Sequence, residues 1–290
     1  MRSSEIVCRE QRIRLQCGER FIRSWDAPEN ALVSGSRRTA LGLIHGLGDH
    51  SGRFHEMARW FAARGLHVYA LDLIGHGNSP GARMAIPDYE SLLQEVESLL
   101  DYVKQQHPDL PIGLFGQSMG GNLVLNHQLR GYSQPAFVIA GSPMLRAVDQ
   151  PAAAQLFLIR VLSRLYPQYP LGGELDPSNL SRDTEMQRAF QKDPLVQRGI
   201  TARVARVLID SGRWAIQSAH RISAPTLLAH GSDDRITCHE ASLEFAEKSL
   251  GKATTMIWPG GKHDLHHDIV REEYFASLFE WIGRAAGKPS

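Results

Sequence analysis

The sequence has few of the features that mark secreted, membrane-spanning or disulfide-stabilised proteins. Only three of its 290 residues are cysteines, Cys8, Cys17 and Cys238. So small and odd a number does not build a disulfide framework, and it favours a reducing, cytoplasmic compartment. No apolar run reaches the roughly 18 residues that a membrane-spanning helix needs. Residues 1–10 carry four charged side chains and no apolar block, so they do not predict a signal peptide.

An excess of charge of one sign is also missing. The chain has 32 Lys and Arg against 31 Asp and Glu, which gives a formal net charge of +1, and no basic run stands out. Proteins that bind nucleic acids through phosphates need a concentrated basic face, so we expect no nucleic-acid partner. There is no internal repeat and no low-complexity tract. With 42% hydrophobic and 22% charged residues, the composition is typical of a globular protein with a large core.

Short apolar segments alternate with amphipathic segments along most of the chain. Residues 6–24 predict an antiparallel hairpin. Buried strands are then expected at 39–44, 67–73, 111–115, 137–140, 226–229 and 254–258, and helices at 55–64, 89–106, 120–130 and 274–282. Such alternation predicts an α/β fold with a mainly parallel central sheet and helices on both faces.

One long stretch interrupts this alternation. Residues 146–213 are helical or irregular in pattern and contain no convincing strand. We expect them to form a helical cap insertion over the carboxyl edge of the sheet, where folds of this class bind their ligands. Residues 1–145 and 214–290 would then form the core of what is overall a single domain.

The strongest chemical signal is Gly116-Gln117-Ser118-Met119-Gly120, which fits G-x-S-x-G. It lies between a predicted strand and a predicted helix, the setting of a nucleophile elbow. The turn there is tight and strained, so glycines are needed beside it and the serine hydroxyl projects into the crevice. Ser118 is therefore the candidate nucleophile. The alternative is a glycine-rich connection that contains a serine by coincidence.

Serine is a weak nucleophile unless a base removes its proton. His263 follows the last predicted strand and satisfies the chain order Ser, acid, His of this type of site. His266 and His267 are rivals, although both are expected to begin the next helical stretch. Asp233 and Asp234 both follow the strand at 226–229. Because Asp commonly caps helices and turns, the local pattern does not separate these two acids.

Two further histidines, His45 and His76, lie beside tight glycine turns. An imidazole at such a place can hydrogen-bond the backbone of the loop. We interpret both as structural rather than catalytic.

Seven motifs together resemble the monoacylglycerol lipase and lysophospholipase-like branch of the α/β-hydrolases, of serine aminopeptidase type. The similarity covers nearly the whole chain. It rests on HGLGDHSGR at 45–53, DLIGHGNS at 72–79, GQSMGG at 116–121, LSRD at 180–183, DPLV at 193–196, GSDDR at 231–235 and HDLH at 263–266. The resemblance implies the α/β-hydrolase fold.

The resemblance also implies roles for particular residues. It assigns the catalytic acid to Asp234, which directly precedes Arg235, and the oxyanion hole to the backbone N–H groups of Leu47 and Met119. Residues matching Asp49, Arg53 and His266 line the polar end of the pocket in glyceride-cleaving relatives.

The sequence departs from the family at two positions. Gln117 replaces the usual histidine before the nucleophile, and its side chain should point away from the chemistry. Asp49 stands where glyceride-cleaving relatives often carry Glu, which weakens the case for a glycerol headgroup.

The implied activity is hydrolysis of carboxylic esters, of monoacylglycerol or lysophospholipid type, through Ser118, His263 and Asp234 and an acyl-enzyme. No cofactor is expected, and no cluster of His, Cys and carboxylates has the sequence spacing of a metal site. The same triad would also suit a thioesterase, an aminopeptidase or a peroxidase-like relative. A non-catalytic binding module on this scaffold is a further alternative.

The expected insertion contains a strongly apolar stretch made of Leu156, Phe157, Ile159, Val161, Leu162 and Leu165. It predicts a cap helix that packs on the body, or a surface that lines an acyl channel or touches a membrane. One face of the helix could pack on the body while another contacts lipid, so both interpretations stay open. A small lipid or ester is the expected partner, with transient membrane contact through the cap. The sequence does not predict the oligomeric state.

Overall fold

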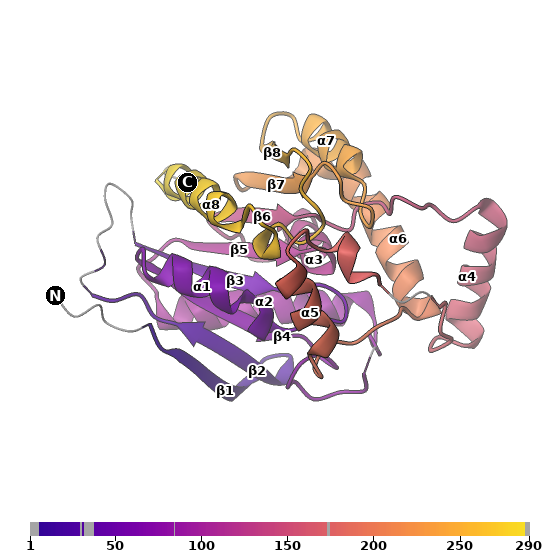
Figure 1. The fold of residues 1–290 in the computed structure, drawn as a ribbon, viewed down its shortest axis with the longest axis horizontal. Coiled ribbons are helices and arrows are strands. Elements are labelled where there is room, and N and C mark those ends of the chain that lie inside the picture. The colour runs from indigo at the N-terminus through magenta and orange to yellow at the C-terminus, as the bar shows by residue number, and fades with distance from the viewer. Residues whose placement is uncertain (1–5, 30, 32–37, 84, 173–174, 288–290) are drawn as a thin grey trace.

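The computed structural model describes residues 6–29, 31, 38–83, 85–172 and 175–287, and an eight-stranded sheet forms its centre (Figure 1). The strands are β1 (Cys8–Leu15), β2 (Gly18–Trp25), β3 (Thr39–Ile44), β4 (Leu66–Asp72), β5 (Ile112–Gln117), β6 (Phe137–Gly141), β7 (Thr226–Gly231) and β8 (Ala253–Trp258). Their spatial order is β1-β2-β4-β3-β5-β6-β7-β8, which places β5 near the middle of the sheet.

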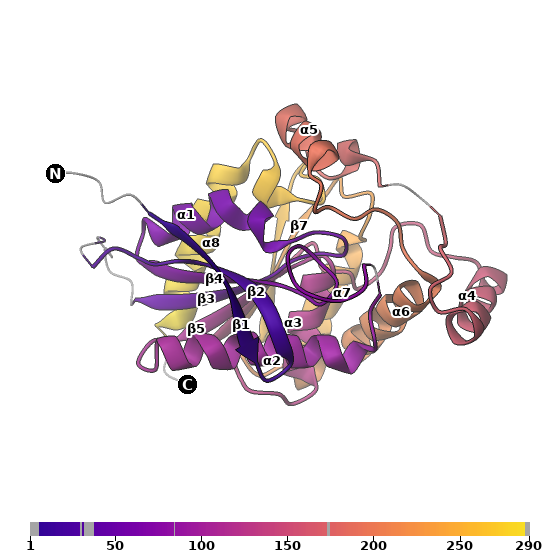
Figure 2. The same cartoon turned by 90° about the horizontal axis from the view of Figure 1, so that it is seen from below.

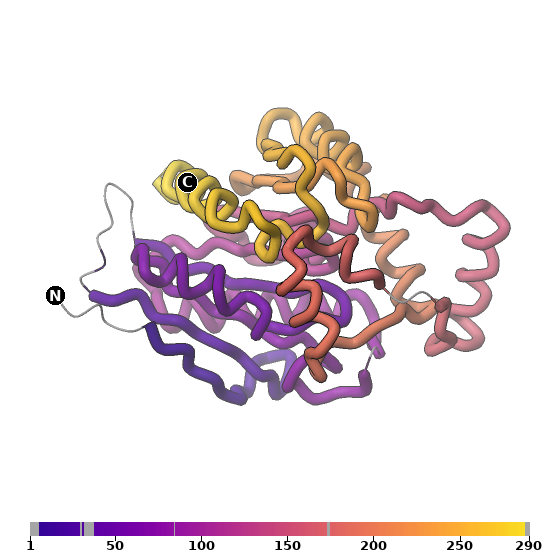
Figure 3. Tube along the Cα trace, viewed as in Figure 1, coloured from indigo at the N-terminus to yellow at the C-terminus, as the bar shows by residue number. Residues whose placement is uncertain are grey.

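The sheet is antiparallel at one edge and parallel elsewhere. β1 pairs with β2, and β2 with β4, in antiparallel register, whereas all pairs from β4 to β8 are parallel. Figure 3 shows the N-terminal hairpin at one edge and β8 near the other. Most side chains of the edge strand β1 are exposed and several are charged, which discourages pairing with another chain. The predicted hairpin and mainly parallel sheet are confirmed.

Helices cover both faces of the sheet (Figure 2). α1 (His55–Ala62) and α8 (Arg271–Ala286) pack on one face, and their core includes Phe61, Phe115 and Tyr274. α2 (Tyr89–Gln106), α3 (Met119–Leu129), α6 (Ala202–Gln217) and α7 (His239–Lys248) contribute to the core on the other face. Side chains of each buried strand alternate between the two cores, as the period of two along a strand requires.

The chain between β6 and β7 contributes helices, and its described residues form no strand of the sheet. They include α4 (Ala153–Leu165), the 3-10 helix η2 (Pro177–Asn179), α5 (Thr184–Lys192) and α6. α6 continues past residue 213, and its Ser211 hydroxyl donates to Asn122 of α3. This part of the segment is therefore joined to the core. The division into a core and a helical cap insertion with limits at 146 and 213 stays a prediction.

α4 is the outermost of these helices and lies at one end of the molecule in both views (Figures 1 and 2). Its main neighbour is α6. Phe157 is 70% exposed and Leu165 is 68% exposed, and Leu158, Tyr166 and Tyr169 are also exposed. α4 thus packs with one side only and presents large apolar side chains to solvent on the other.

Two of the compositional expectations concern the described part of the chain. None of its helices combines the length and apolar character that crossing a membrane requires. Cys8, Cys17 and Cys238 are all free thiols.

Candidate active site

The nucleophile position is a sharp bend between the end of β5 and the start of α3. Ser118 has φ 54° and ψ −110°, a left-handed conformation that costs a non-glycine residue about 1–3 kcal/mol. Its N–H donates to the carbonyl of Gly141, and its own carbonyl accepts from the N–H groups of Asn122 and Met144. These bonds hold the strained backbone in place.

The two glycines of the motif are required by close backbone contacts. A Cβ at Gly120 would lie 2.1 Å from the carbonyl oxygen of Ile44, and one at Gly116 would lie 2.1 Å from the carbonyl oxygen of Gly120. Neither neighbour can move without displacing a central strand or the helix that begins at the bend. The pattern of glycines around Ser118 therefore follows from the packing of β3, β5 and α3.

The structure places Asp234, and not Asp233, against His263. His263 Nδ1 lies 2.8 Å from Asp234 Oδ2, and both side chains are buried. Asp233 instead lies 3.7 Å from Arg235 and 3.9 Å from Lys262 and is half-exposed. The choice between the two acids, which the local pattern left open, is decided by the loop after β7.

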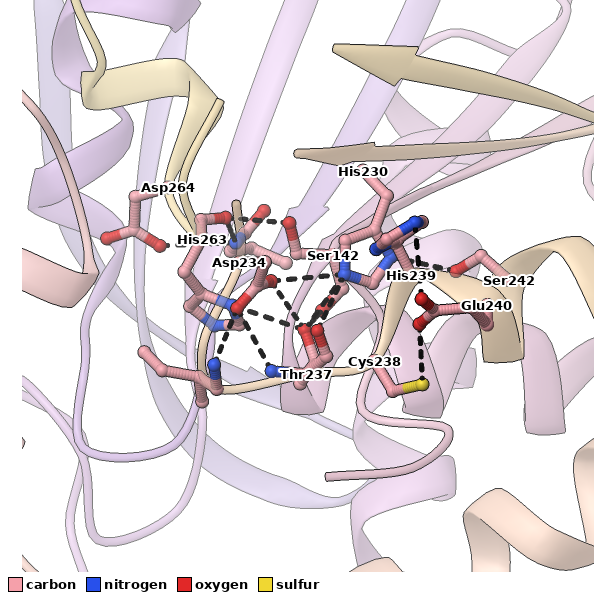
Figure 4. A network of polar contacts seen from close by, with 12 residues as sticks. Ser142, His230, Asp234, Thr237, Cys238, His239, Glu240, Ser242, His263 and Asp264 are labelled. Atoms are coloured by element: carbon pink, nitrogen blue, oxygen red, sulfur yellow. Dashed lines mark hydrogen bonds and ion pairs between the residues drawn. The ribbon is translucent and has the colours of Figure 1, made fainter. Parts of the chain in front are cut away.

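Asp234 is held by four further hydrogen bonds (Figure 4). Its Oδ1 accepts from the backbone N–H groups of Ile236 and Thr237, at 2.8 and 3.0 Å. Its Oδ2 accepts from the Thr237 hydroxyl at 2.7 Å and lies 3.1 Å from His230 Nε2. His230 is itself fixed through Nδ1 by the hydroxyl of Ser242. With so many partners, the carboxylate has one orientation.

Burial and charge act in opposite directions on this pair. Burial by itself would raise the pKa of Asp234, but the nearby imidazoles of His263 and His230 lower it well below its ordinary value. Burial by itself would lower the pKa of His263, but the charge and hydrogen bond of Asp234 raise it above the ordinary 6.5. The carboxylate stays ionised, and it favours a positive charge on the imidazole.

The backbone of His263 is also held from behind. Its carbonyl oxygen accepts from Gln117 Nε2 at 2.9 Å and from the Ser142 hydroxyl at 2.7 Å. Gln117 Nε2 also lies 3.1 Å from Asp264 Oδ1. The contacts that Gln117, Ser142 and His230 make with His263 and Asp234 were not predicted from the sequence. Gln117 and Ser142 are separated from His263 by more than 100 positions, so no local pattern could reveal their contacts with it.

Ser118 and His263 line one pocket with a volume of about 560 Å³. The expected oxyanion-hole residues Leu47 and Met119 line it as well. Met119 is the first residue of α3, so its N–H has no acceptor within the helix. Gly46, the neighbour of Leu47, packs directly against Ser118.

The remainder of the pocket is largely apolar, and the segment between β6 and β7 supplies much of it. The apolar lining includes Met144, Leu175, Leu180, Phe190, Ile200, Leu208 and Ile236. Polar and charged residues line it as well, among them Asp149, Asp176, Arg198 and Arg235. Its volume lies in the range of about 300–1,000 Å³ that is usual for sites that bind small organic ligands.

The three expected substrate-binding residues lie at different depths. Asp49 lines the pocket, but Arg53 and His266 are not among the described residues that do so. Arg53 Nε lies 2.9 Å from Asp49 Oδ1, so it reaches the pocket through that carboxylate. His266 is 1% exposed, and its ring packs against Phe54. Direct contact of these residues with a substrate stays a prediction.

His45 and His76 both contact loop backbone. His45 Nε2 accepts from the N–H of Leu73, and its Nδ1 lies 2.7 Å from the carbonyl of Gly46. His76 Nδ1 lies 3.0 Å from the carbonyl of Ile74, and burial lowers the pKa of His76 to about 3. These neutral rings hold the turns beside the pocket, as the sequence interpretation expected.

Comparison with known proteins agrees with this geometry. The family described as serine aminopeptidase, S33, matches residues 35–269. A monoacylglycerol lipase of Mycolicibacterium smegmatis is 31% identical over 247 residues, which cover 84% of this chain and 88% of that protein. An abhydrolase domain-containing protein of Dictyostelium discoideum is also 31% identical, but the match spans 26% of its length and 83% of this chain.

Among solved structures, the monoacylglycerol lipase of Paleococcus ferrophilus superimposes with a TM-score of 0.80 at 30% identity, covering 92% of this chain and 99% of that one. The shared sheet, the nucleophile bend and the family match lead to one assignment. The chain belongs to the serine aminopeptidase S33 family of α/β-hydrolases, and it is a serine hydrolase.

Proposed function

We propose that the protein hydrolyses carboxylic esters of monoacylglycerol or lysophospholipid type through Ser118, His263 and Asp234. The observation that carries the proposal is the pairing of His263 Nδ1 with Asp234 at 2.8 Å beside a pocket that His263 shares with the strained Ser118. Because Nδ1 is engaged by the carboxylate, the other ring nitrogen, Nε2, is available to the serine hydroxyl.

In the first half-reaction, Ser118 Oγ attacks the acyl carbonyl carbon while His263 Nε2 accepts the hydroxyl proton. The oxyanion that forms accepts hydrogen bonds from the N–H groups of Leu47 and Met119, each worth about 3 kcal/mol to the barrier. The tetrahedral intermediate then collapses. The bond to the alcohol breaks, His263 donates its proton to the leaving oxygen, and the acyl group remains on Ser118 as an ester.

In the second half-reaction, water replaces the alcohol. His263 accepts a proton from water, whose oxygen attacks the acyl-enzyme carbonyl. Collapse of this second intermediate releases the carboxylic acid and returns the proton to Ser118. Throughout, Asp234 keeps the imidazole in one tautomer and stabilises its transient positive charge. No step requires a metal or an organic cofactor.

A lipid ester suits the pocket better than a peptide does. Its apolar lining, with Phe190, Ile200 and Leu208 among the contributors, would bury an acyl chain, and Asp49 is a polar group near the catalytic end. Relatives in the family include enzymes named monoacylglycerol lipase, which supports this substrate class.

We further propose that the enzyme is cytoplasmic and touches membranes through α4. The exposed side chains of Phe157, Leu158 and Leu165 lie on the same helix as Arg160 and Arg164. Peripheral proteins commonly bind membranes in this way: apolar side chains enter the membrane–water interface, and neighbouring cations attract anionic lipids. Three free thiols favour a reducing compartment.

The first test is covalent labelling by a fluorophosphonate probe. Wild type should be labelled, Ser118→Ala should not, and Ser133→Ala, which alters an exposed serine beyond α3, should be labelled like wild type. Equal labelling of wild type and Ser118→Ala would overturn the nucleophile assignment. Absence of labelling in all three proteins would favour the non-catalytic binding module.

The second test is a substrate series. Monoacylglycerols of several acyl lengths, lysophospholipids and short aryl esters should be compared with thioester and amide analogues of matched acyl length. The highest kcat/KM is expected for a monoacylglycerol or a lysophospholipid. Faster cleavage of the thioester or amide member would instead assign a thioesterase or an aminopeptidase.

A further inference from the structure

A second cluster of polar side chains lies at the opposite end of the strands from the active site. Asp26 directly follows β2, His67 is the second residue of β4, and His107 is the residue after the end of α2. Trp25 of β2 pairs with Val68 of β4, so one more step along this antiparallel pair brings Asp26 opposite His67. Ser118, in contrast, follows the carboxyl end of the parallel strand β5.

The ligand atoms of this cluster lie close enough together to hold one metal ion. Asp26, His67 and His107 each offer one atom, and these atoms all lie within 4.8 Å of one another. Asp26 Oδ1 and His67 Nδ1 are 3.3 Å apart, which is long for a hydrogen bond to a carboxylate, normally about 2.7–2.9 Å. Two ligands of a tetrahedral zinc ion at about 2.0–2.1 Å from it are separated by roughly 3.3–3.4 Å.

Neighbouring groups orient the three side chains. The hydroxyl of Tyr69 lies 2.8 Å from His107 Nε2, which fixes the direction of that ring. Arg9 binds the other carboxylate oxygen of Asp26, Oδ2, and leaves Oδ1 facing His67. Hydrogen bonds from outside groups to the ligands are a regular feature of metal sites. Asp26 and His67 are also partly exposed, so an ion can reach them.

The residue types indicate which ions would bind. Imidazole nitrogen suits zinc, copper and nickel, whereas magnesium and calcium prefer oxygen ligands. Asp26, His67 and His107 lie far apart in the sequence, so no sequence motif reveals the cluster. The fold alone brings them together.

A similar group, Asp264, His266 and His267, is less suited to a cation. It is fully buried, and the guanidinium of Arg53 lies 2.9 Å from His267 Nδ1 and 3.5 Å from Asp264. A positive group already stands where an ion would bind. Near Asp26 the cation is Arg9, which contacts Oδ2 and not the oxygen that faces His67.

We propose that Asp26, His67 and His107 bind one divalent transition-metal ion of the zinc type, with water completing a tetrahedron. The ion would join β2, β4 and the end of α2. Because this site lies away from the pocket, its role is to stabilise the fold rather than to take part in ester cleavage.

The test uses the full chain after treatment with a chelator. Titration with Zn²⁺ by calorimetry should give one tight site, and Co²⁺ should give the visible absorption of a tetrahedral site with nitrogen and oxygen ligands. Asp26→Asn and His67→Gln should each weaken Zn²⁺ binding at least tenfold and remove the Co²⁺ absorption. His220→Gln, at an exposed histidine outside the cluster, should bind like wild type.

Thermal unfolding provides a second measurement. Zn²⁺ should raise the melting temperature of wild type and of Ser118→Ala, but not that of Asp26→Asn, whose amide has the same shape as the carboxylate. Unchanged affinity in both cluster variants, or no tight Zn²⁺ site in wild type, would overturn the proposal. Neither readout depends on catalysis, so failure here is distinct from failure of the proposed ester hydrolysis.

Discussion

The loops around His263 and the helix α4 differ in which kinds of side chain they bury and which they expose. Around His263, polar side chains are buried and held by several partners each, as Asp234 and Gln117 illustrate. On α4, large apolar side chains such as Phe157 and Leu165 are exposed. The first region stabilises one geometry, and the second leaves apolar surface uncovered that a lipid phase could cover.

This contrast indicates where substitutions should change activity most. An active site must hold its groups close to the productive geometry, and this precision comes from packing and surrounding hydrogen bonds. A lipid-contacting surface needs only apolar area and suitable charge. We therefore expect large effects from single atoms near His263 and small, graded effects from whole side chains on α4.

The largest effect is expected from Asp234→Asn, which replaces one oxygen by an amide nitrogen. The amide favours the wrong tautomer of His263, and in well-studied triads this lowers kcat by about 10⁴. The measurement is kcat on a soluble short-chain ester. Asp233→Asn is the matched control, because Asp233 does not contact His263, and it should retain close to full activity. A large loss in the control with a small loss in Asp234→Asn would reverse the assignment.

Acidification should reveal the electrostatics of the same pair. His263 acts as a base only when neutral, and Asp234 raises its pKa above 6.5. A raised pKa means that the imidazole gains its proton at a higher pH, so kcat/KM should begin to fall above pH 6.5. Below the pKa, the fall should be about tenfold per pH unit.

The residual activity of Asp234→Asn tests the cause of that shift. Without the charge of Asp234, burial of His263 is left as the main influence, and burial lowers a histidine pKa. The inflection of the pH profile should therefore move to lower pH. An inflection at the same pH in both proteins would show that another group controls the titration.

A moderate effect is expected from Gln117→Leu, which removes the donor to His263 and Asp264. Removing a buried hydrogen-bond partner costs about 1–3 kcal/mol of stability. We expect kcat to fall about tenfold with little change in KM, since the loss acts on the orientation of His263 and not on substrate binding. Gln117→His, which introduces the side chain that the family usually carries, should restore most of kcat. No restoration would reduce the role of Gln117 to packing.

The smallest effect is expected from substitutions on α4. Phe157→Ser combined with Leu165→Ser should lower the rate on monoacylglycerol in anionic vesicles several-fold, by weakening interfacial binding. The rate on a water-soluble ester should not change. Leu243→Ser removes an exposed leucine from α7 instead and serves as the control. A rate loss on the soluble ester as well would assign α4 to the pocket rather than to the lipid surface.

The sequence predicted the strands and helices of the core well, because buried segments have a clear apolar period. The predicted limits at 39–44 and 89–106 match β3 and α2. β5 was predicted to end at residue 115 but continues to Gln117, because Gln117 still pairs with Gly141 of β6. Where a strand ends depends on its pairing with strands distant in sequence, and the local apolar periodicity carries no information about that pairing.

The candidate catalytic residues could be predicted from the sequence to different degrees. Local contacts leave a sequence pattern, whereas contacts between distant segments do not. Ser118 lies in a local motif whose glycines reflect contacts within a few residues and one adjacent strand. Asp234 was chosen over Asp233 only through the family resemblance, since both follow the same strand. The contacts of Gln117 and Ser142 with His263 could not be predicted, because they join residues that only the sheet order brings together.

From the sequence alone came the class of fold, the tight turn at Ser118 and the chain order of the candidate catalytic residues, because apolar periodicity and a tight glycine turn are local properties. Tertiary structure decided which aspartate faces His263 and which side chains hold the imidazole from behind. It also placed Arg53 behind Asp49 and brought Asp26, His67 and His107 together. Those relations depend on how strands far apart in the chain lie side by side, and packing of the whole molecule sets that arrangement.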